Sequence, residues 1–368
     1  MFFALSDEQD ELASTVRALL AKRSDRGSVR RAIEEPKGYD EGLWSVLCEQ
    51  IGASALAIPE EYGGAGFSLF ETCIVLEELG AALAPSPLLG SGVLAAQALL
   101  LSGSESECRA LLPAVAEGTT VAALLWAGAD GRWCTDDAAV TATARGDEWL
   151  LTGAGHFVLE GDTADELLVL ASTGEGVSLF RVDPTQPAVR RTRTPGMDLT
   201  LRFATVALTE AEATLVSADA AAWLPRLRDV ACTAVSALQV GAAQRCLEMT
   251  VAYAKERVQF GRPIGSFQAL KHRMADMLVE VETSRSASWA AAWSAAYGDD
   301  DLPIRAATAK AWCSEALNAV AAECVQLHGG IAITWEHDAQ MYFKRAHATS
   351  QLFGQPHEHR RRLFTLFF

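Results

Sequence analysis

One short segment of the sequence concentrates positive charge in a chain that is otherwise strongly acidic. The 368 residues contain 47 Asp and Glu against 31 Lys and Arg, which gives a formal net charge of −16. Between positions 255 and 273 the cationic side chains gather: Lys255, Arg257, Arg262, Lys271 and Arg273. Because guanidinium groups bind phosphate oxygens in pairs, an anionic ligand is expected to bind at this segment.

The overall charge argues against two classes of partner. A net negative surface repels the phosphate backbone of nucleic acids and anionic membranes, so we expect neither as a partner. The first five residues lead directly into Ser6-Asp7-Glu8 and are too short for a signal-peptide core. The longest apolar run, at 230–243, is too short to cross a bilayer.

Neither the cysteines nor the histidines have the spacing of a metal site. The eight cysteines include no Cys-x-x-Cys pair, and several lie in apolar helical patterns where a thiol packs as a small hydrophobe. The histidines from His328 to His359 match no His-Glu-x-x-His or Cys/His pattern. We therefore predict no metal, reduced thiols and a cytoplasmic protein.

Two stretches of different texture precede the C-terminal part. Residues 1–118 have helical periodicity, and Ser6 with Gln9 has the form of a capping box. Residues 119–217 contain short β-prone runs separated by Gly, Asp and Pro, which predicts a β-barrel or sandwich. Half of all residues are hydrophobic, so the chain can bury a substantial core.

The C-terminal stretch, 218–368, predicts long helices over 229–259, 266–297 and 303–327, with Gly298 as a stop signal. Helices of this length, with apolar positions on more than one face, usually form a bundle and often an oligomer interface. The predicted fold is therefore α+β: an N-terminal helical domain, a middle β-domain and a C-terminal four-helix-bundle-like domain, assembled as a dimer or tetramer.

Several motifs in this order resemble those of the acyl-CoA dehydrogenase family. PEEYGGAG at 59–66 is similar to the family's P-E-x-Y-G-G-x-G. ERVQFGRPI at 256–264, followed by FQ at 267–268, is similar to R-x-x-F-G-x-P-I…FQ. QLHGG at 326–330 is similar to Q-x-x-G-G, and WE at 335–336 and KRA at 344–346 continue the family's C-terminal layout. The resemblance covers essentially the whole chain.

The resemblance implies an FAD-dependent enzyme that oxidises the α–β carbon bond of an acyl-CoA thioester, with an electron-transfer flavoprotein-like acceptor. The flavin lies at a subunit interface in this family, and these motifs serve the neighbouring subunit's flavin. The residues implied in cofactor binding are Arg257, Phe260, Gln268, Gln326, Gly329 and Gly330. Their chemistry agrees: a guanidinium suits the pyrophosphate, and glycines let the backbone approach a ligand closely.

The family's catalytic base is missing from both of its usual places. The reaction needs a carboxylate beside the substrate α-carbon. Alignment to the family's usual Y-E-G site places Phe353 at the glutamate, and alignment to its alternative site on the long helix places Ala231 there. Asp229 is a weak candidate, about 200° round the helix from Ala231; the alternative is a solvated charge beside Arg228.

The middle stretch also departs from the family. LLWAGADG at 124–131 replaces T-E-P…G-S-D, and Phe157-Val158-Leu159 replaces W-I-T, while His156 stands at the family's lysine. The chain thus keeps the motifs that would contact the flavin of a neighbouring subunit. It lacks many of the residues that would bind its own flavin. This resembles actinobacterial heterotetramers that handle bulky acyl groups such as steroid side-chain CoA thioesters. Alternatives are a homotetramer with an unconventional base, a flavin oxidase or monooxygenase, and a non-catalytic interaction protein.

Overall fold

The computed structural model describes residues 4–146 and 148–367. Helices occupy the chain as far as Ala116, strands lie between Ala122 and Ser217, and helices return from Leu224. This is the predicted order of an acyl-CoA dehydrogenase-like α+β fold. By internal contacts the chain forms two compact units, and each is described here by itself.

The first unit, called the helical unit below, consists of Met1–Arg30, Cys73–Ala84 and Cys232–Phe368. Its elements, some of which continue beyond it, are α1 (Asp7–Arg23), α2 (Arg26–Glu34), α4 (Leu69–Ala82), α7 (Leu224–Glu256), β8 (Val258–Gln259), β9 (Arg262–Pro263), a 3-10 turn (Ile264–Ser266), α8 (Gln268–Tyr297), α9 (Leu302–His328), a second 3-10 turn (Gly329–Ile333), α10 (Ala339–Gln351) and α11 (Pro356–Phe367).

Local sequence signals explain the ends of these helices. The capping box is confirmed: the Gln9 backbone N–H donates to Ser6 Oγ, and the Ser6 N–H donates to the Gln9 side chain. Gly298 adopts φ 71° and ends α8, as predicted. The three predicted long helices are confirmed, with boundaries shifted by up to five residues.

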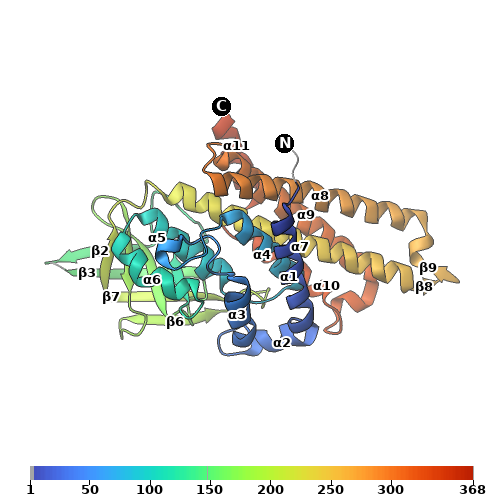
Figure 1. Ribbon diagram of the computed structural model, residues 1–368, viewed down its shortest axis with the longest axis horizontal. Helices are drawn as coiled ribbons and strands as arrows, with labels where there is room; N and C mark the ends of the chain where they lie inside the picture. Colours follow the sequence, from blue (N-terminus) through green and yellow to red (C-terminus); the bar gives the residue numbers. More distant parts are fainter. Residues whose placement is uncertain (1–3, 147, 368) are drawn as a thin grey trace. The chain divides into compact units, whose positions relative to one another are not determined.

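Helices α4 and α7 cross at glycines. A Cβ added to Gly241 would lie 1.7 Å from the carbonyl oxygen of Glu77, and one added to Gly80 would lie 2.1 Å from that of Leu238. Only glycine permits this approach of two backbones. Figure 1 shows α7, α8 and α9 as the long helices of this unit, with the β8–β9 hairpin beyond one end of α7 and α8.

Helix α9 with its following turn, Leu302–Ile333, contains an 18-residue window with a mean hydropathy of 1.2, so by length and composition it could cross a membrane. A buried bundle helix passes the same test, so this is weak evidence. α9 contacts α8, α10 and α11.

The second unit, called the mixed unit, consists of Arg31–Thr72 and Pro85–Ala231. Its helical elements are α3 (Glu41–Val46), a π-helix (Leu47–Ile51), a 3-10 turn (Glu60–Tyr62), a second π-helix (Leu88–Ala95), α5 (Ala96–Ser102) and α6 (Glu105–Ala116). Its strands are β1 (Ala122–Leu125), β2 (Val140–Arg145), β3 (Glu148–Leu159), β4 (Glu166–Ser172), β5 (Val177–Val182), β6 (Val189–Thr194) and β7 (Phe203–Ser217).

The strands close into a barrel. Strand β4 pairs with β2 on one side and β5 on the other, and the ring continues through β3 and β7. β1 adds to β4 in parallel, and β6 adds to β7. The interior is filled by apolar side chains that include Leu151, Val169, Phe180 and Val206. The predicted β-domain is thus a barrel.

Candidate functional site

The β8–β9 hairpin presents the first group of predicted cofactor-binding residues. Phe260 and Gly261 form its two-residue turn with φ angles of 53° and 76°, values that a type I′ turn requires. The turn leaves the Phe260 side chain 90% exposed. Its ring meets Phe267 edge-on, with 6.1 Å between centroids, and the Arg262 guanidinium lies 4.1 Å from the centre of the Phe267 ring.

The end of α9 presents the second group. Gly329 ends the helix with φ 66°, and a Cβ added at Gly329 or Gly330 would meet no atom within 4 Å. The backbone is therefore open to close approach by a ligand. Tyr253, in the last turns of α7, stacks on His328 with ring centroids 4.5 Å apart, which brings the ends of α7 and α9 together.

Helix α8 joins the same end of the bundle, because Arg273 forms a 2.6 Å ion pair with Glu323 of α9. The ends of α7 and α9 and the start of α8 thus carry all the predicted cofactor-binding residues. We call this set the half-site: Arg257, Phe260, Gln268, Gln326, Gly329 and Gly330. Five side-chain contacts, made by residues of the half-site or close to them in the sequence, hold the helix ends and the hairpin in place.

The charges around the half-site suit an anionic cofactor. Arg273 is neutralised by Glu323, whereas Lys255, Arg257, Arg262 and Lys271 are exposed and form no ion pair within 4–146 and 148–367. A cluster of unpaired cations beside an open glycine backbone fits the pyrophosphate of a dinucleotide such as FAD. Among the described residues, no group of three or more His, Cys, Asp or Glu could hold a metal ion.

Phe353, which the sequence comparison above predicts at the family's usual base position, lies in the short loop between α10 and α11. The side chain is buried, and the backbone adopts φ 57°, an unusual value for a bulky residue. His359 Nε2 lies 3.0 Å from the Phe353 carbonyl oxygen, to which it donates. The loop is therefore fixed by its backbone, and the Phe353 side chain itself offers no ionisable group.

A buried lysine, missed by sequence reasoning, holds the same loop. Lys310 Nζ donates to Ser314 Oγ at 3.0 Å and to the carbonyl oxygens of Ser350 and Gly354 at 3.1 Å each. Burial lowers the pKa of Lys310 to about 8. Gln239 of α7 extends the network by donating to Ser314 Oγ and Thr349 Oγ1. One network therefore ties α7, α9 and α10 to the loop.

The other two candidate positions lie on α7. Ala231 is buried and carries no proton acceptor. Asp229 is only 2% exposed, so the alternative that it is a solvated charge beside Arg228 is wrong. Its neighbour in the sequence, Val230, is buried as well. The pattern of charged residues alone did not show that the Asp229 side chain is buried. Glu248, in contrast, is a surface charge paired with Arg245.

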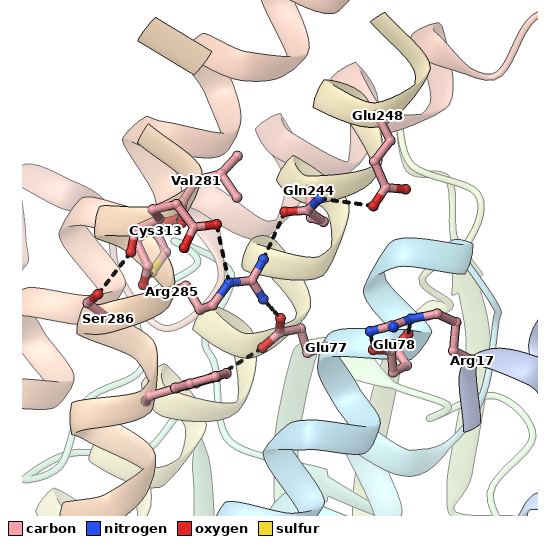
Figure 2. Close-up of polar contacts among 12 residues, drawn as sticks. Arg17, Glu77, Glu78, Gln244, Glu248, Val281, Arg285, Ser286 and Cys313 are labelled. Atoms are coloured by element: carbon pink, nitrogen blue, oxygen red, sulfur yellow. Dashed lines mark hydrogen bonds and ion pairs between the residues drawn. The ribbon is translucent and has the colours of Figure 1, made fainter. Parts of the chain in front are cut away.

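Figure 2 shows ion pairs that join helices of the helical unit. Arg285 of α8 forms an ion pair with Glu77 of α4 and donates at 2.9 Å to Gln244 of α7. Trp289 Nε1 also donates to Glu77, at 3.1 Å. Arg17 of α1 pairs with the neighbouring carboxylate, that of Glu78, in the same picture.

These ion pairs line a cavity of about 850 Å³ between α1, α4, α7, α8 and α10. Arg26 and Arg30 in its wall pair with Asp338, and Arg285 pairs with Glu77. Because these arginines are already neutralised by carboxylates of the same wall, the cavity lacks the unpaired cations found at the half-site. Its polar groups serve mainly to join helices.

The segments that depart from the family form an irregular region of the mixed unit. Strand β3 bulges against β7 between Gly155 and Val158, and Phe157 within the bulge adopts φ 52°. A bulge of this kind changes the direction in which the nearby side chains point. Trp126 is buried and donates to the Cys134 carbonyl oxygen at 2.6 Å.

Just after this bulge lies a second group that sequence reasoning missed. Glu160 is 5% exposed, and its Oε2 atom has no hydrogen-bond partner among the described residues. Burial, and then the nearby Asp162, raise its pKa to about 8, although Arg202 opposes the shift. Arg202 is engaged by Asp162 at 2.6 Å. The sequence did carry a signal for this group. An acidic residue follows directly after Val158 and Leu159, the apolar residues at the end of a strand.

The fold and the site define a flavin-dependent acyl-CoA oxidoreductase. The model described as "Acyl-CoA dehydrogenase, N-terminal domain" matches residues 6–119, and that described as "Acyl-CoA dehydrogenase, C-terminal domain" matches 229–363. The chain belongs to the acyl-CoA dehydrogenase family.

Particular relatives refine the comparison. Acyl-CoA dehydrogenase IpdE2 of Mycolicibacterium smegmatis is 43% identical over 363 residues, which cover 98% of both chains. The protein of the same name from Mycobacterium tuberculosis is 42% identical over 97% of this chain and 96% of its own length.

Two solved structures are also similar over nearly the whole chain. The Tcur3481-Tcur3483 steroid acyl-CoA dehydrogenase has a TM-score of 0.88 at 33% identity, with 98% of each chain covered. The ChsE4-ChsE5 complex from Mycobacterium tuberculosis has a TM-score of 0.90 at 31% identity, covering 100% of this chain and 99% of the other. Both descriptions name two different components.

Proposed function

We propose that this chain is the subunit without a base in a heteromeric, FAD-dependent acyl-CoA dehydrogenase, where it completes a flavin site of a base-bearing partner. The observation that carries the proposal is the buried Phe353 at the family's base position, in a loop fixed by His359 and Lys310. A side chain without an ionisable group there cannot take the substrate α-proton.

The exposed half-site supplies the other part of the proposal. Arg257 is placed to bind cofactor phosphate, and Gly329 and Gly330 allow the backbone to approach the cofactor. When bound, FAD supplies the hydride acceptor of the dehydrogenation. The partner's carboxylate takes the proton, and the electrons pass to an electron-transfer flavoprotein-like acceptor.

The two-component relatives support a heterotetramer, and the word "steroid" in one description supports a bulky steroid-derived CoA thioester as substrate. All eight cysteines are free, which supports a reducing, cytoplasmic location.

The test is the visible absorption spectrum of the purified chain, alone and co-expressed with the acyl-CoA dehydrogenase-like subunit encoded next to it. We expect a colourless lone chain and a yellow complex that oxidises acyl-CoA. A yellow lone chain whose turnover disappears in Asp229→Asn would instead establish a homo-oligomer with an unconventional base. A stable complex that never binds flavin would establish a non-catalytic interaction protein.

A further inference from the structure

Three large apolar side chains are exposed to solvent directly after the paired glycines of the half-site. Ile331, Ile333 and Trp335 are 40%, 74% and 66% exposed. All three follow Gly330 in the sequence, the last of them five positions later, and we call them the apolar ridge. Single exposed apolar residues are common on protein surfaces, whereas a contiguous group of them usually marks a site of interaction.

The apolar ridge continues a stretch of α9 that the chain leaves largely uncovered. The 18-residue window within Leu302–Ile333 that has a mean hydropathy of 1.2 is only 39% buried. A helix that is apolar all round is expected to be buried in the core. On α9 the short apolar side chains of Ala319 and Ala322 are exposed as well. The chain by itself therefore does not cover the apolar surface that this segment presents.

Contacts beneath the apolar ridge fix its conformation. The ridge starts in the 3-10 turn Gly329–Ile333. Arg30 of α2 donates to the Trp335 carbonyl oxygen at 3.1 Å and forms a 2.7 Å ion pair with Asp338. Lys344 Nζ lies 4.9 Å from the centre of the Trp335 ring. A surface that is already ordered loses less conformational entropy when it binds, so this segment is suited to recognition.

We propose that the apolar ridge is the protein–protein part of the interface with the base-bearing subunit, and that Trp335 is its main anchor. The proposal rests on the proposed function, in which a flavin at Gly329 and Gly330 is completed by the partner. The partner's surface must therefore reach this backbone, and Trp335 lies at most about 18 Å from Gly330 along the chain. Tryptophan is also enriched among the residues that dominate binding energy.

The charges beside the apolar ridge indicate what kind of surface fits it. Lys344 forms no ion pair with any residue that the structure describes, and four more such cations belong to the half-site region: Lys255, Arg257, Arg262 and Lys271. A complementary surface has an apolar pocket with carboxylates at its edge. Two copies of this chain that met ridge to ridge would bring these cations together, so the charges favour a different subunit as the occupant.

The first experiment measures the affinity of the full-length chain for the acyl-CoA dehydrogenase-like subunit encoded next to it, by biolayer interferometry. We expect Trp335→Ala to weaken binding about thirtyfold or more, because a central aromatic anchor is lost. Ile333→Asp should weaken it as well, since it places a charge in the apolar contact. Phe67→Ala is the matched control, because Phe67 is 64% exposed in the mixed unit, and it should bind like wild type.

The replaced side chains are exposed, so circular dichroism and thermal unfolding should show that both ridge variants fold like wild type. A weakened interaction in these variants then reports on the interface itself. Equal affinity of Trp335→Ala and wild type for the neighbouring subunit would overturn the docking surface and leave the flavin half-site standing.

The second experiment separates assembly from flavin binding. At protein concentrations that restore the complex, Trp335→Ala should bind FAD as tightly as wild type, whereas Arg257→Ala should assemble normally and bind FAD weakly. Loss of FAD from a Trp335→Ala complex that assembles normally would overturn the protein–protein role. A wild-type complex that depends on Trp335 but never binds flavin would refute the proposed function and leave the docking surface standing.

Two other occupants of the apolar ridge give different results. Sedimentation velocity of the lone chain detects binding to a second copy, and flotation with phosphatidylcholine–phosphatidylglycerol vesicles detects binding to a membrane. We expect Trp335→Ala to change neither measurement. Self-association or vesicle binding that Trp335→Ala abolishes would overturn the choice of the base-bearing subunit as the occupant.

Discussion

The ammonium group of Lys310 lies 3.1 Å from the carbonyl oxygen of Gly354, so a fully buried side chain holds the loop that contains Phe353. The same group also donates to the Ser350 carbonyl oxygen at the end of α10. One buried side chain thus anchors both the end of α10 and the loop that follows it.

Removing the buried ammonium should destabilise the helical unit. We expect Lys310→Met to lower the free energy of unfolding by about 2–3 kcal/mol, because the buried carbonyl oxygens of Ser350 and Gly354 lose their donor. Lys22→Met, at an exposed position of α1, is the control and should change stability by less than about 0.5 kcal/mol. Urea unfolding measures both; equal effects would contradict the role of Lys310.

The charge of Lys310 also predicts a pH dependence. Burial lowers its pKa from 10.5 to about 8, so between these values the unfolded chain binds the additional proton. Stability contributed by this group therefore rises as the pH increases from about 8 to 10.5. Lys310→Met should lack this rise. The check is the difference in unfolding free energy between wild type and variant across that range.

Glu160 should have the opposite pH dependence. Its pKa is raised from 4.5 to about 8, so the folded chain holds a proton that the unfolded chain has lost. This contribution to stability is complete below pH 4.5 and is lost as the pH rises to about 8. The charged groups that act on it are Asp162, which raises its pKa, and Arg202, which lowers it.

An amide in place of the Glu160 carboxyl group should abolish this loss. We expect Glu160→Gln to be more stable than wild type at pH 8.5, by on the order of 3 kcal/mol, and similar to it near pH 4.5. The exposed Glu175→Gln is the matched control, with no comparable gain. Thermal or urea unfolding at the two pH values measures this difference. The same pH dependence of the unfolding free energy in Glu160→Gln and in wild type would refute the assignment.

The Arg285–Glu77 ion pair should contribute far more than a surface pair. The two side chains are only 19% and 13% exposed, so Glu77→Gln leaves a largely buried guanidinium uncompensated. We expect a loss of about 3 kcal/mol in unfolding free energy. Glu248→Gln breaks the exposed pair with Arg245 and should lose less than about 1 kcal/mol. Similar losses in the two variants would show that the pair does not brace α4 against α8.

Arg257 should matter for flavin in the complex with the partner. We expect Arg257→Ala to raise the dissociation constant for FAD about ten- to hundredfold, because a charge-assisted contact to phosphate is lost. Arg361→Ala, an exposed arginine of α11, is the control and should bind FAD normally. Flavin fluorescence titration of the apo-complex measures both, and unchanged binding by Arg257→Ala would remove this residue from the half-site.

The sequence by itself determined the elements with local signals. The Ser6 capping box and the Gly298 stop depend on residues a few positions apart, and both are found in the structure. The ordered motifs around Arg257 and Gln326 identified the family, because they describe contiguous loops and helix ends. The prediction that the base is missing also comes from the sequence alone, since it depends only on which residue stands at position 353.

The tertiary structure alone decided which distant groups meet. Glu77 and Arg285 are 208 positions apart, and Lys310 meets Gly354 across 44 positions. Asp229 looked like a solvated charge because its neighbours in sequence say little about what packs over it. Burial, and with it the pKa shifts of Glu160 and Lys310, results from helices and strands packing together, which no local pattern records.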